Sequence, residues 1–162
     1  MSNVAVTEHV AAPASHVWDL LVDLSGRQRW MSTVESLEVL TDGDFGVGTR
    51  WRESHRLGRR QVIEEYEVER CDPQELLVLS SPGRGADYRM SYRLSGEPAG
   101  RRSGGTVVTI EQEGHPTGSG GRILEWVLGG LAAQTVEGAL RQELADLARV
   151  AIASAHPGSA LR

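Results

Sequence analysis

One apolar seam near the C-terminus constrains the fold of this chain more than any other feature. Between Gly121 and Ala153, small or apolar residues recur every three or four positions: Trp126, Gly129, Ala133, Val136, Leu140, Leu144, Leu147 and Ala151. This spacing is typical of one face of an α-helix. Roughly 30 residues of helix measure about 45 Å. We therefore expect a curved sheet to grip a long C-terminal helix.

The residues in the middle of the seam have small side chains. Gly129 and Ala133 stand there in place of large side chains, and Gly129 is followed by Gly130. A glycine inside a helix costs about 1 kcal/mol relative to alanine. We therefore expect the glycine pair to have a use, either a bend or a cavity beside the helix.

The first half of this helix carries a second apolar row on nearly the opposite side: Leu124, Val127, Leu128 and Leu131. In the second half the corresponding residues are polar: Arg141, Gln142, Asp146 and Arg149. The helix should thus be surrounded at its start and covered on one side only at its end. Two interpretations of the apolar row stay open. Loops and a short helix cover it, or it forms a homodimer contact or a mobile lid, because exposed apolar patches mark interaction sites.

Length and charge exclude several classes of protein. The 162 residues suit one domain, which we place at residues 1–155, with 156–162 as a disordered tail. No apolar run approaches the ~18 residues of a membrane span, and the N-terminus lacks a signal-peptide pattern. We therefore expect a cytoplasmic protein without stable membrane insertion. The net charge of -5 argues against a general nucleic-acid-binding protein.

The residue types present exclude several kinds of chemistry. Cys71 is the single cysteine, and all 17 basic residues are arginine. An internal disulfide and a thiolate metal cluster are therefore excluded. The lack of lysine likewise excludes a Schiff base, a pyridoxal phosphate anchor and a phosphate-loop lysine. The histidines, at positions 9, 16, 55, 115 and 156, lack metal-ligand spacing, so we expect neither a metal nor a cofactor.

The rest of the sequence predicts a strand, two short helices and six consecutive strands. Residues 4–10 alternate as a strand, and Ala12-Pro13 opens a helix with apolar residues at helical spacing. A second short helix follows at 27–31. The period then changes to two, which predicts strands at 34–40, 49–56, 60–70, 75–80, 86–95 and 106–113. Seven such strands form a curved antiparallel sheet, whose apolar face only the C-terminal helix is long enough to cover.

Several short motifs carry a resemblance that spans essentially the whole chain. They are Ala12-Pro13 with Val17-Trp18 and Leu21, Asp23-Leu24 before Trp30, Gly46-Val47-Gly48-Thr49, Asp72-Pro73, and Gly105-Thr106 before the long helix. In this order they resemble the SRPBCC superfamily of START-like and birch-pollen-allergen-like proteins, in particular its bacterial polyketide cyclase/dehydrase-like branch. The resemblance implies an α+β helix-grip fold with a deep cavity between sheet and C-terminal helix. Some relatives hold lipids there and others guide polyketide cyclisation, so the fold does not fix the function.

The strand at 49–56 supplies the candidate catalytic residues. Its arginines at 50, 52 and 56 share one face, which we place outside, so Trp51, Glu53 and His55 turn toward the cavity. A carboxylate beside an imidazole is a proton-transfer couple, which makes Glu53 and His55 the candidates. With the opposite orientation the two would form an ion pair on the outer face. Both orientations stay open.

A second group of side chains is predicted to contact a ligand. Its members are Trp51, Glu64, Tyr66, Tyr88, Met90, Tyr92, Gln112, Trp126, Gly129, Gly130 and Ala133. A mostly apolar lining with a few convergent polar groups is typical of ligand sites. Alternatively, Glu64 is a solvated strand residue among other glutamates, and the aromatic residues only pack in the core.

The sequence therefore predicts a protein that binds a hydrophobic or amphipathic small molecule, lipid-like or polyketide-like. The second hypothesis is a polyketide aromatase/cyclase or dehydratase, in which the shape of the cavity folds a reactive chain. The third is a ligand-free protein-interaction module, which would leave the small residues at 129 and 133 unexplained. The expected partners are a small hydrophobic ligand and a second copy of the chain, and not a nucleic acid.

Overall fold

A computed structural model of the chain describes residues 2–57, 59–83, 86–97, 104–117 and 130–155. Seven strands form one antiparallel sheet in the order β1-β7-β6-β5-β4-β3-β2. They are β1 (Ser2–Val10), β2 (Val34–Val39), β3 (Arg50–Leu57), β4 (Arg60–Asp72), β5 (Leu76–Pro82), β6 (Ala86–Gly96) and β7 (Thr106–Pro116). The seven predicted strands are thus confirmed, and the first and last of them pair with each other.

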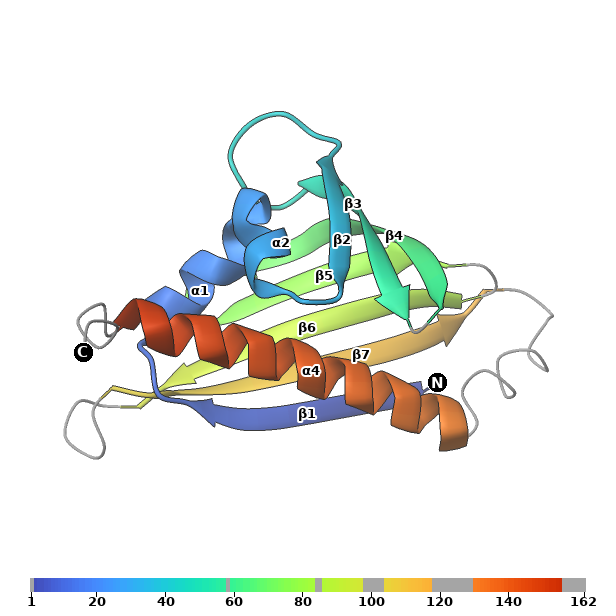
Figure 1. Cartoon of the computed structure of the whole chain (residues 1–162). Coiled ribbons are helices and arrows are strands. Elements are labelled where there is room, and N and C mark those ends of the chain that lie inside the picture. Colours follow the sequence, from blue (N-terminus) through green and yellow to red (C-terminus); the bar gives the residue numbers. More distant parts are fainter. Residues whose placement is uncertain (1, 58, 84–85, 98–103, 118–129, 156–162) are drawn as a thin grey trace.

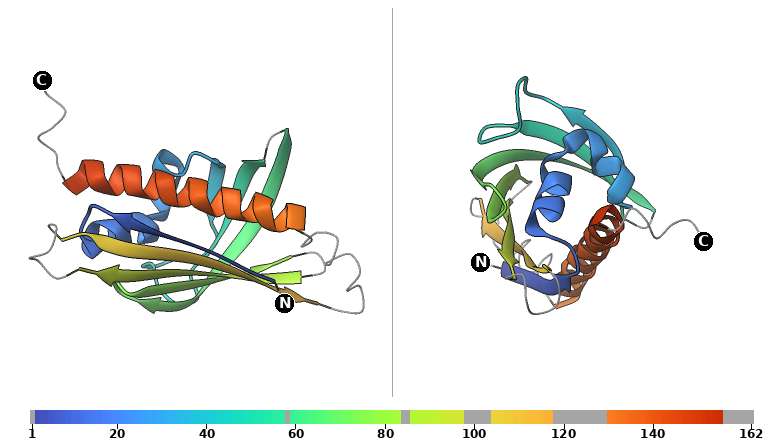
Figure 2. Two further views of the ribbon diagram at one scale, coloured as in Figure 1. Left: turned by 90° about the horizontal axis from the view of Figure 1, so that it is seen from below. Right: turned by 90° about the vertical axis from the view of Figure 1, so that its left-hand side faces the viewer.

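Three α-helices accompany the sheet in the described part of the chain. Helices α1 (Ala14–Val22) and α2 (Arg27–Trp30) lie between β1 and β2 in the chain, and α4 (Gly130–Ala155) follows β7. Figure 1 shows α4 running along the hollow side of the sheet, with α1 and α2 near its C-terminal half. Seen end-on in Figure 2, the sheet curves around α1, and α4 lies along the opening of the curve. This is the predicted α+β helix-grip fold.

The apolar seam of α4 faces the sheet, as predicted, over the part that is described. Leu140, Leu144, Leu147 and Ala151 are each at most 2% exposed. They pack with residues of the strands and of α1 in one core. Residues 118–129 lie outside the described part, so the predicted start of the helix and its second apolar row up to residue 128 are not tested. The homodimer contact therefore stays a prediction.

One prediction about α4 is wrong. The spacing of its residues predicts Asp146 on the polar side of the helix, together with Arg141, Gln142 and Arg149. These three are exposed, but Asp146 is 5% exposed. Its carboxylate accepts hydrogen bonds from the backbone N–H of Ser32 at 2.9 Å and from the Ser32 hydroxyl at 2.6 Å. The loop between α2 and β2 therefore covers this side of the helix, which the spacing of residues within α4 cannot show.

The orientation of β3 is the one that places its arginines outside. Arg50, Arg52 and Arg56 are exposed, whereas Trp51 is 1% exposed and Glu53 fully buried. Alternate side chains of a strand point to opposite faces, so His55 shares the inner face. The alternative of an outer-face pair between Glu53 and His55 is therefore excluded.

The two short helices close one end of the hollow. Pro13 is the residue before α1, and three side chains of the helix, Val17, Trp18 and Leu21, are buried. Trp30, at the end of α2, is 2% exposed, and its indole N–H donates to the carbonyl of Leu20 at 3.2 Å. Within the described residues, no helix combines the length and apolarity needed to span a membrane.

Candidate functional site

A cavity of about 170 Å³ lies between the inner face of the sheet and α4. Its apolar walls are formed by Met31, Tyr66, Met90, Val136, Ala139 and Leu140. Its polar walls are formed by Thr33, His55, Glu64, Gln112, Thr135 and Glu143. Because these residues come from four strands, one loop and α4, only the complete fold brings them together.

A smaller hollow of about 40 Å³ adjoins this cavity along the sheet. Four residues line both spaces: Glu64, Tyr66, Met90 and Gln112. Tyr88, a predicted ligand contact, lines only the smaller one. The two hollows therefore form one continuous region of the inner sheet face.

Apart from Tyr88, the predicted site residues fall into four groups. His55, Glu64, Tyr66, Met90 and Gln112 line the cavity. Trp51, Glu53 and Tyr92 are buried and are not among its lining residues. Trp126 and Gly129 lie outside the described residues, while Gly130 and Ala133 belong to the start of α4. A cavity beside the small residues therefore stays a prediction.

Glu53 is a buried carboxylate with cationic neighbours. Its Oε1 atom accepts hydrogen bonds from Arg27 Nε and, at 2.7 Å, from Trp51 Nε1. Its Oε2 atom lies 2.9 Å from His55 Nε2, at an ion-pair distance but without hydrogen-bond geometry. Burial raises the pKa of Glu53, but Arg27 and then His55 outweigh it and bring the pKa to about 2. Glu53 is thus ionised at neutral pH.

Arg27 neutralises that charge from the side away from His55. Its side chain is 4% exposed, and its guanidinium carbon lies 5.4 Å from the ring centre of Trp30 and 6.0 Å from that of Trp51. Its Nη2 atom lies 3.9 Å from Glu143 Oε1. Burial lowers the pKa of Arg27, but the adjacent Glu53 and other partners raise it overall. Sequence analysis missed this residue, although an arginine within a short helix beside Trp30 is a usable signal.

His55 connects the buried ion pair with the cavity. Besides its contact with Glu53, its Nε2 atom lies 3.5 Å from Glu64 Oε2, and its Nδ1 atom lies 3.5 Å from Thr33 Oγ1. Burial lowers the pKa of His55, but Glu53 and then Glu64 outweigh it, so that the pKa is raised. A histidine changes charge near physiological pH, so His55 is a side chain of this cavity wall that can gain or lose a proton in that range.

Two buried tyrosines donate hydrogen bonds to the carboxylates that line the cavity. Tyr66 OH donates to Glu64 Oε2 at 2.7 Å, and Tyr92 OH donates to Glu143 Oε1. Burial and then the neighbouring carboxylates raise both tyrosine pKa values well above 10. Both phenols are therefore neutral donors at physiological pH.

Glu143 is the second residue that sequence analysis missed. Its side chain is 10% exposed. Burial raises its pKa, while Arg27 and Tyr92 act in the opposite direction without reversing the shift. The available signal was an acidic residue directly beside the seam at Leu144. Despite these carboxylates and His55, the described residues contain no group of three His, Cys, Asp or Glu that could hold a metal ion.

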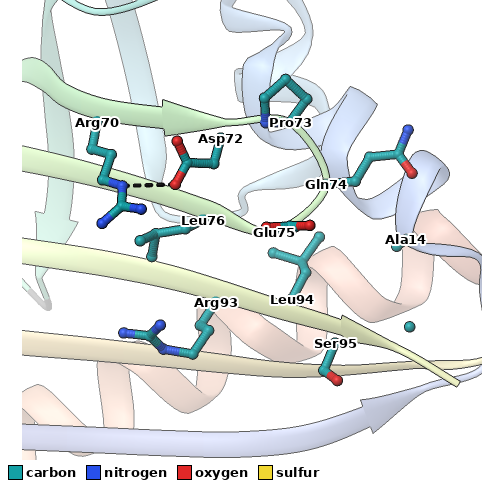
Figure 3. A pocket seen from close by; sticks show the side chains of 11 residues that line it. Ala14, Arg70, Asp72, Pro73, Gln74, Glu75, Leu76, Arg93, Leu94 and Ser95 are labelled. Carbon is teal, nitrogen blue, oxygen red and sulfur yellow. Dashed lines mark hydrogen bonds and ion pairs between the residues drawn. The ribbon is translucent and has the colours of Figure 1, made fainter.

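A larger hollow of about 640 Å³ lies away from this cluster, at the turn between β4 and β5. Figure 3 shows that its lining side chains come from this turn, the end of β6 and the start of α1. Arg70 and Asp72, both at the end of β4, pair at one side of it at 2.7 Å, with side chains 61% and 39% exposed. It is thus an open surface groove, and the less open, more apolar cavity under α4 is the better candidate site despite its smaller volume.

Comparison with known proteins agrees with this architecture. The family of polyketide cyclase/dehydrase and lipid transport proteins matches residues 1–151. No curated protein matches the chain.

Several solved structures share the fold. The protein TTHA0849 from Thermus thermophilus is 23% identical, with a TM-score of 0.74, covering 94% of this chain and 99% of that one. A START superfamily protein from Mycobacterium smegmatis is 13% identical, with a TM-score of 0.72 and coverage of 93% and 97%. A point mutant of norcoclaurine synthase from Thalictrum flavum, in complex with a transition-state analogue, is 16% identical, with a TM-score of 0.70 and coverage of 94% and 95%. With a family match over nearly its whole length, this chain belongs to the polyketide cyclase/dehydrase and lipid transport family.

Proposed function

We propose that this protein binds a small hydrophobic or amphipathic molecule in the cavity between the sheet and α4. The observation that carries the proposal is a partly enclosed space whose lining residues are half apolar and which receives the polar side chains of His55, Glu64 and Glu143. Ligand sites combine these two properties, because apolar walls supply affinity and a few polar groups fix orientation.

The volume of the cavity limits the ligand. An apolar cavity of about 150 Å³ binds a molecule the size of benzene. The 170 Å³ here therefore accommodate one ring or a short branched chain, with its polar group toward the polar part of the wall. This size favours a small ligand over an extended lipid.

Two variants of α4 test the proposal. Ala139 lines the cavity but is exposed, so a larger side chain there would enter the space without disturbing the core. Ala145 is exposed on the same helix and is not among the residues lining the cavity. We expect toluene, followed by NMR chemical shifts, to bind wild type and Ala145→Phe alike, and Ala139→Phe at least tenfold more weakly. No binding to wild type, or equal binding to all three proteins, would refute the proposal.

Native mass spectrometry of protein isolated from its own host addresses the identity of the ligand. A co-purifying adduct whose mass fits a molecule of about one ring would support the proposed function. Loss of the adduct from Ala139→Phe, with its retention in Ala145→Phe, would place that molecule in the cavity.

A second candidate is a cyclase or dehydratase acting on a polyketide-like substrate. It is favoured by His55, which faces the cavity and lies within 3.5 Å of both Glu53 and Glu64. His55 would transfer the proton, while Glu53, with a pKa of about 2, would remain ionised and position it. The cavity volume ranks this candidate second, because a polyketide of several rings exceeds it. An unchanged product profile with His55→Gln would remove the enzyme hypothesis.

A further inference from the structure

The charged side chains around the cavity are mostly acidic. Glu64 and Glu143 both line it, and His55 is the only lining residue that can carry a positive charge among the described residues. No arginine stands among the lining residues that the structure describes, and the chain contains no lysine. A ligand therefore meets two carboxylates and one imidazole.

The buried guanidinium nearby offsets only part of this negative charge. Arg27 donates to Glu53, its Nη2 atom lies 3.9 Å from Glu143 Oε1, and Arg27 is not among the residues that line the cavity. Its single positive charge is therefore shared between Glu53 and Glu143. Even with His55 protonated, Arg27 and His55 supply two positive charges to the three carboxyl groups of Glu53, Glu64 and Glu143.

We infer that the cavity selects a small protonated amine, with an apolar body of about one ring and its ammonium group at the Glu143 carboxylate. This inference rests on the proposed function and specifies its ligand class. Glu143 is better placed than Glu64, since its side chain is 10% exposed and that of Glu64 is 38% exposed. Charge-assisted hydrogen bonds are roughly twice as strong as neutral ones, and burial strengthens them further. An acidic ligand would instead bring a third carboxylate to the same wall.

Three one-ring compounds of similar shape test the inference: benzylamine, benzyl alcohol and benzoate. Their affinities are measured by isothermal titration calorimetry at pH 7.5, where benzylamine is protonated. We expect wild type to bind benzylamine at least tenfold more tightly than benzyl alcohol, and benzoate most weakly.

The variant Glu143→Gln keeps the size of the side chain and an acceptor for Tyr92. We expect it to bind benzylamine about tenfold more weakly and benzyl alcohol within twofold of wild type. The matched control is Glu137→Gln on the same helix, whose side chain is 44% exposed and pairs with Arg141 at 2.7 Å. It should bind all three compounds as wild type does. Melting temperatures establish that both variants are folded, and Glu64→Gln provides a second charge-removing variant.

The outcomes separate this inference from the proposed function. If benzyl alcohol binds as tightly as benzylamine, the amine preference is wrong and the binding function stands. If Glu143→Gln and Glu64→Gln both retain the full benzylamine preference, the assignment to the wall carboxylates is wrong. If none of the three compounds binds wild type, both the inference and the proposed function fall.

Discussion

The imidazole of His55 and the carboxylate of Glu53 face each other at 2.9 Å inside the sheet, with Nε2 and Oε2 as the closest atoms. The other oxygen of Glu53 binds Arg27. The fully buried carboxylate of Glu53 thus contacts both Arg27 and His55. Of these two, only His55 is among the residues that line the cavity. The charge of the candidate site therefore depends on a residue that a ligand in this cavity would not touch.

Replacing Glu53 by glutamine should destabilise the protein strongly. Arg27 would remain buried without its main countercharge, and loss of one partner from a buried ion pair typically costs about 3–5 kcal/mol. Urea unfolding at pH 7 measures this loss. As the pH falls from about 4.5 to about 2, Glu53 becomes protonated in wild type, so the difference between the two proteins should shrink.

The control for this variant is Glu65→Gln. Glu65 pairs with Arg52 at 2.6 Å, but on the outer face of the sheet. Solvent screens such a pair, so we expect a much smaller loss of stability. Equal losses of stability in Glu53→Gln and Glu65→Gln would contradict the expectation that breaking the buried pair costs more than breaking the exposed one.

His55 should make the protein less stable as the pH rises above 6.5. Its pKa is raised in the folded state, chiefly by Glu53 and then by Glu64 against the effect of burial and of Arg27. The stabilisation is therefore complete below the unfolded pKa of about 6.5 and is lost as the pH rises through the folded value. The stability of wild type minus that of His55→Gln should accordingly decrease between pH 6 and pH 9. A difference that stays constant over this range would show that the pKa is not raised.

The variant Glu143→Gln should be more stable than wild type at pH 8. Burial raises the pKa of Glu143, which means that its ionised form is held at a cost in the folded protein. That cost is absent below pH 4.5, where the carboxyl is protonated in both states, grows as the pH rises above 4.5 and is complete above the folded pKa. We expect a gain of about 1 kcal/mol, a usual size for a stabilising substitution at a functional site. Thermal unfolding at pH 8 and pH 4 checks this, and a gain of equal size at both would contradict it.

Asp146→Ala should destabilise the protein and loosen the loop that carries Thr33. The variant removes the acceptor for two groups of Ser32, and a buried donor left without a partner costs about 1–3 kcal/mol. Urea unfolding gives the loss, and hydrogen exchange at the Ser32 amide should become faster. A double-mutant cycle with Ser32→Ala should show coupling, and strictly additive effects would exclude the proposed contact.

Strand periodicity predicted the part of the site that lies on the sheet. In β3, the shared face of the three arginines favoured an inward Glu53 but left the opposite orientation open, and the structure buries Glu53 and, in β6, the predicted ligand contact Tyr92. This works because consecutive side chains of a strand point to opposite faces, so a single exposed residue orients its neighbours.

The same reasoning failed where a side chain is buried by a distant segment. Asp146 has a polar residue type, yet the loop at Ser32 covers it. Arg27 and Glu143 are buried because they meet Glu53 and Tyr92, which are 26 and 51 residues away in the chain. Periodicity along one element carries no information about such partners.

The order of strands and helices, the apolar seam of α4 and the side chains that share a face of each strand were predictable, because they follow from the local periodicity of side chains. Which face of β3 is the inner one, which charges are paired and which of them face the cavity depend on contacts between elements. The distances between the charged groups, and the burial of each group, are set when β3, α2 and α4 pack together. These two quantities set the pKa values of Glu53, His55 and Glu143 and hence the chemistry of the site.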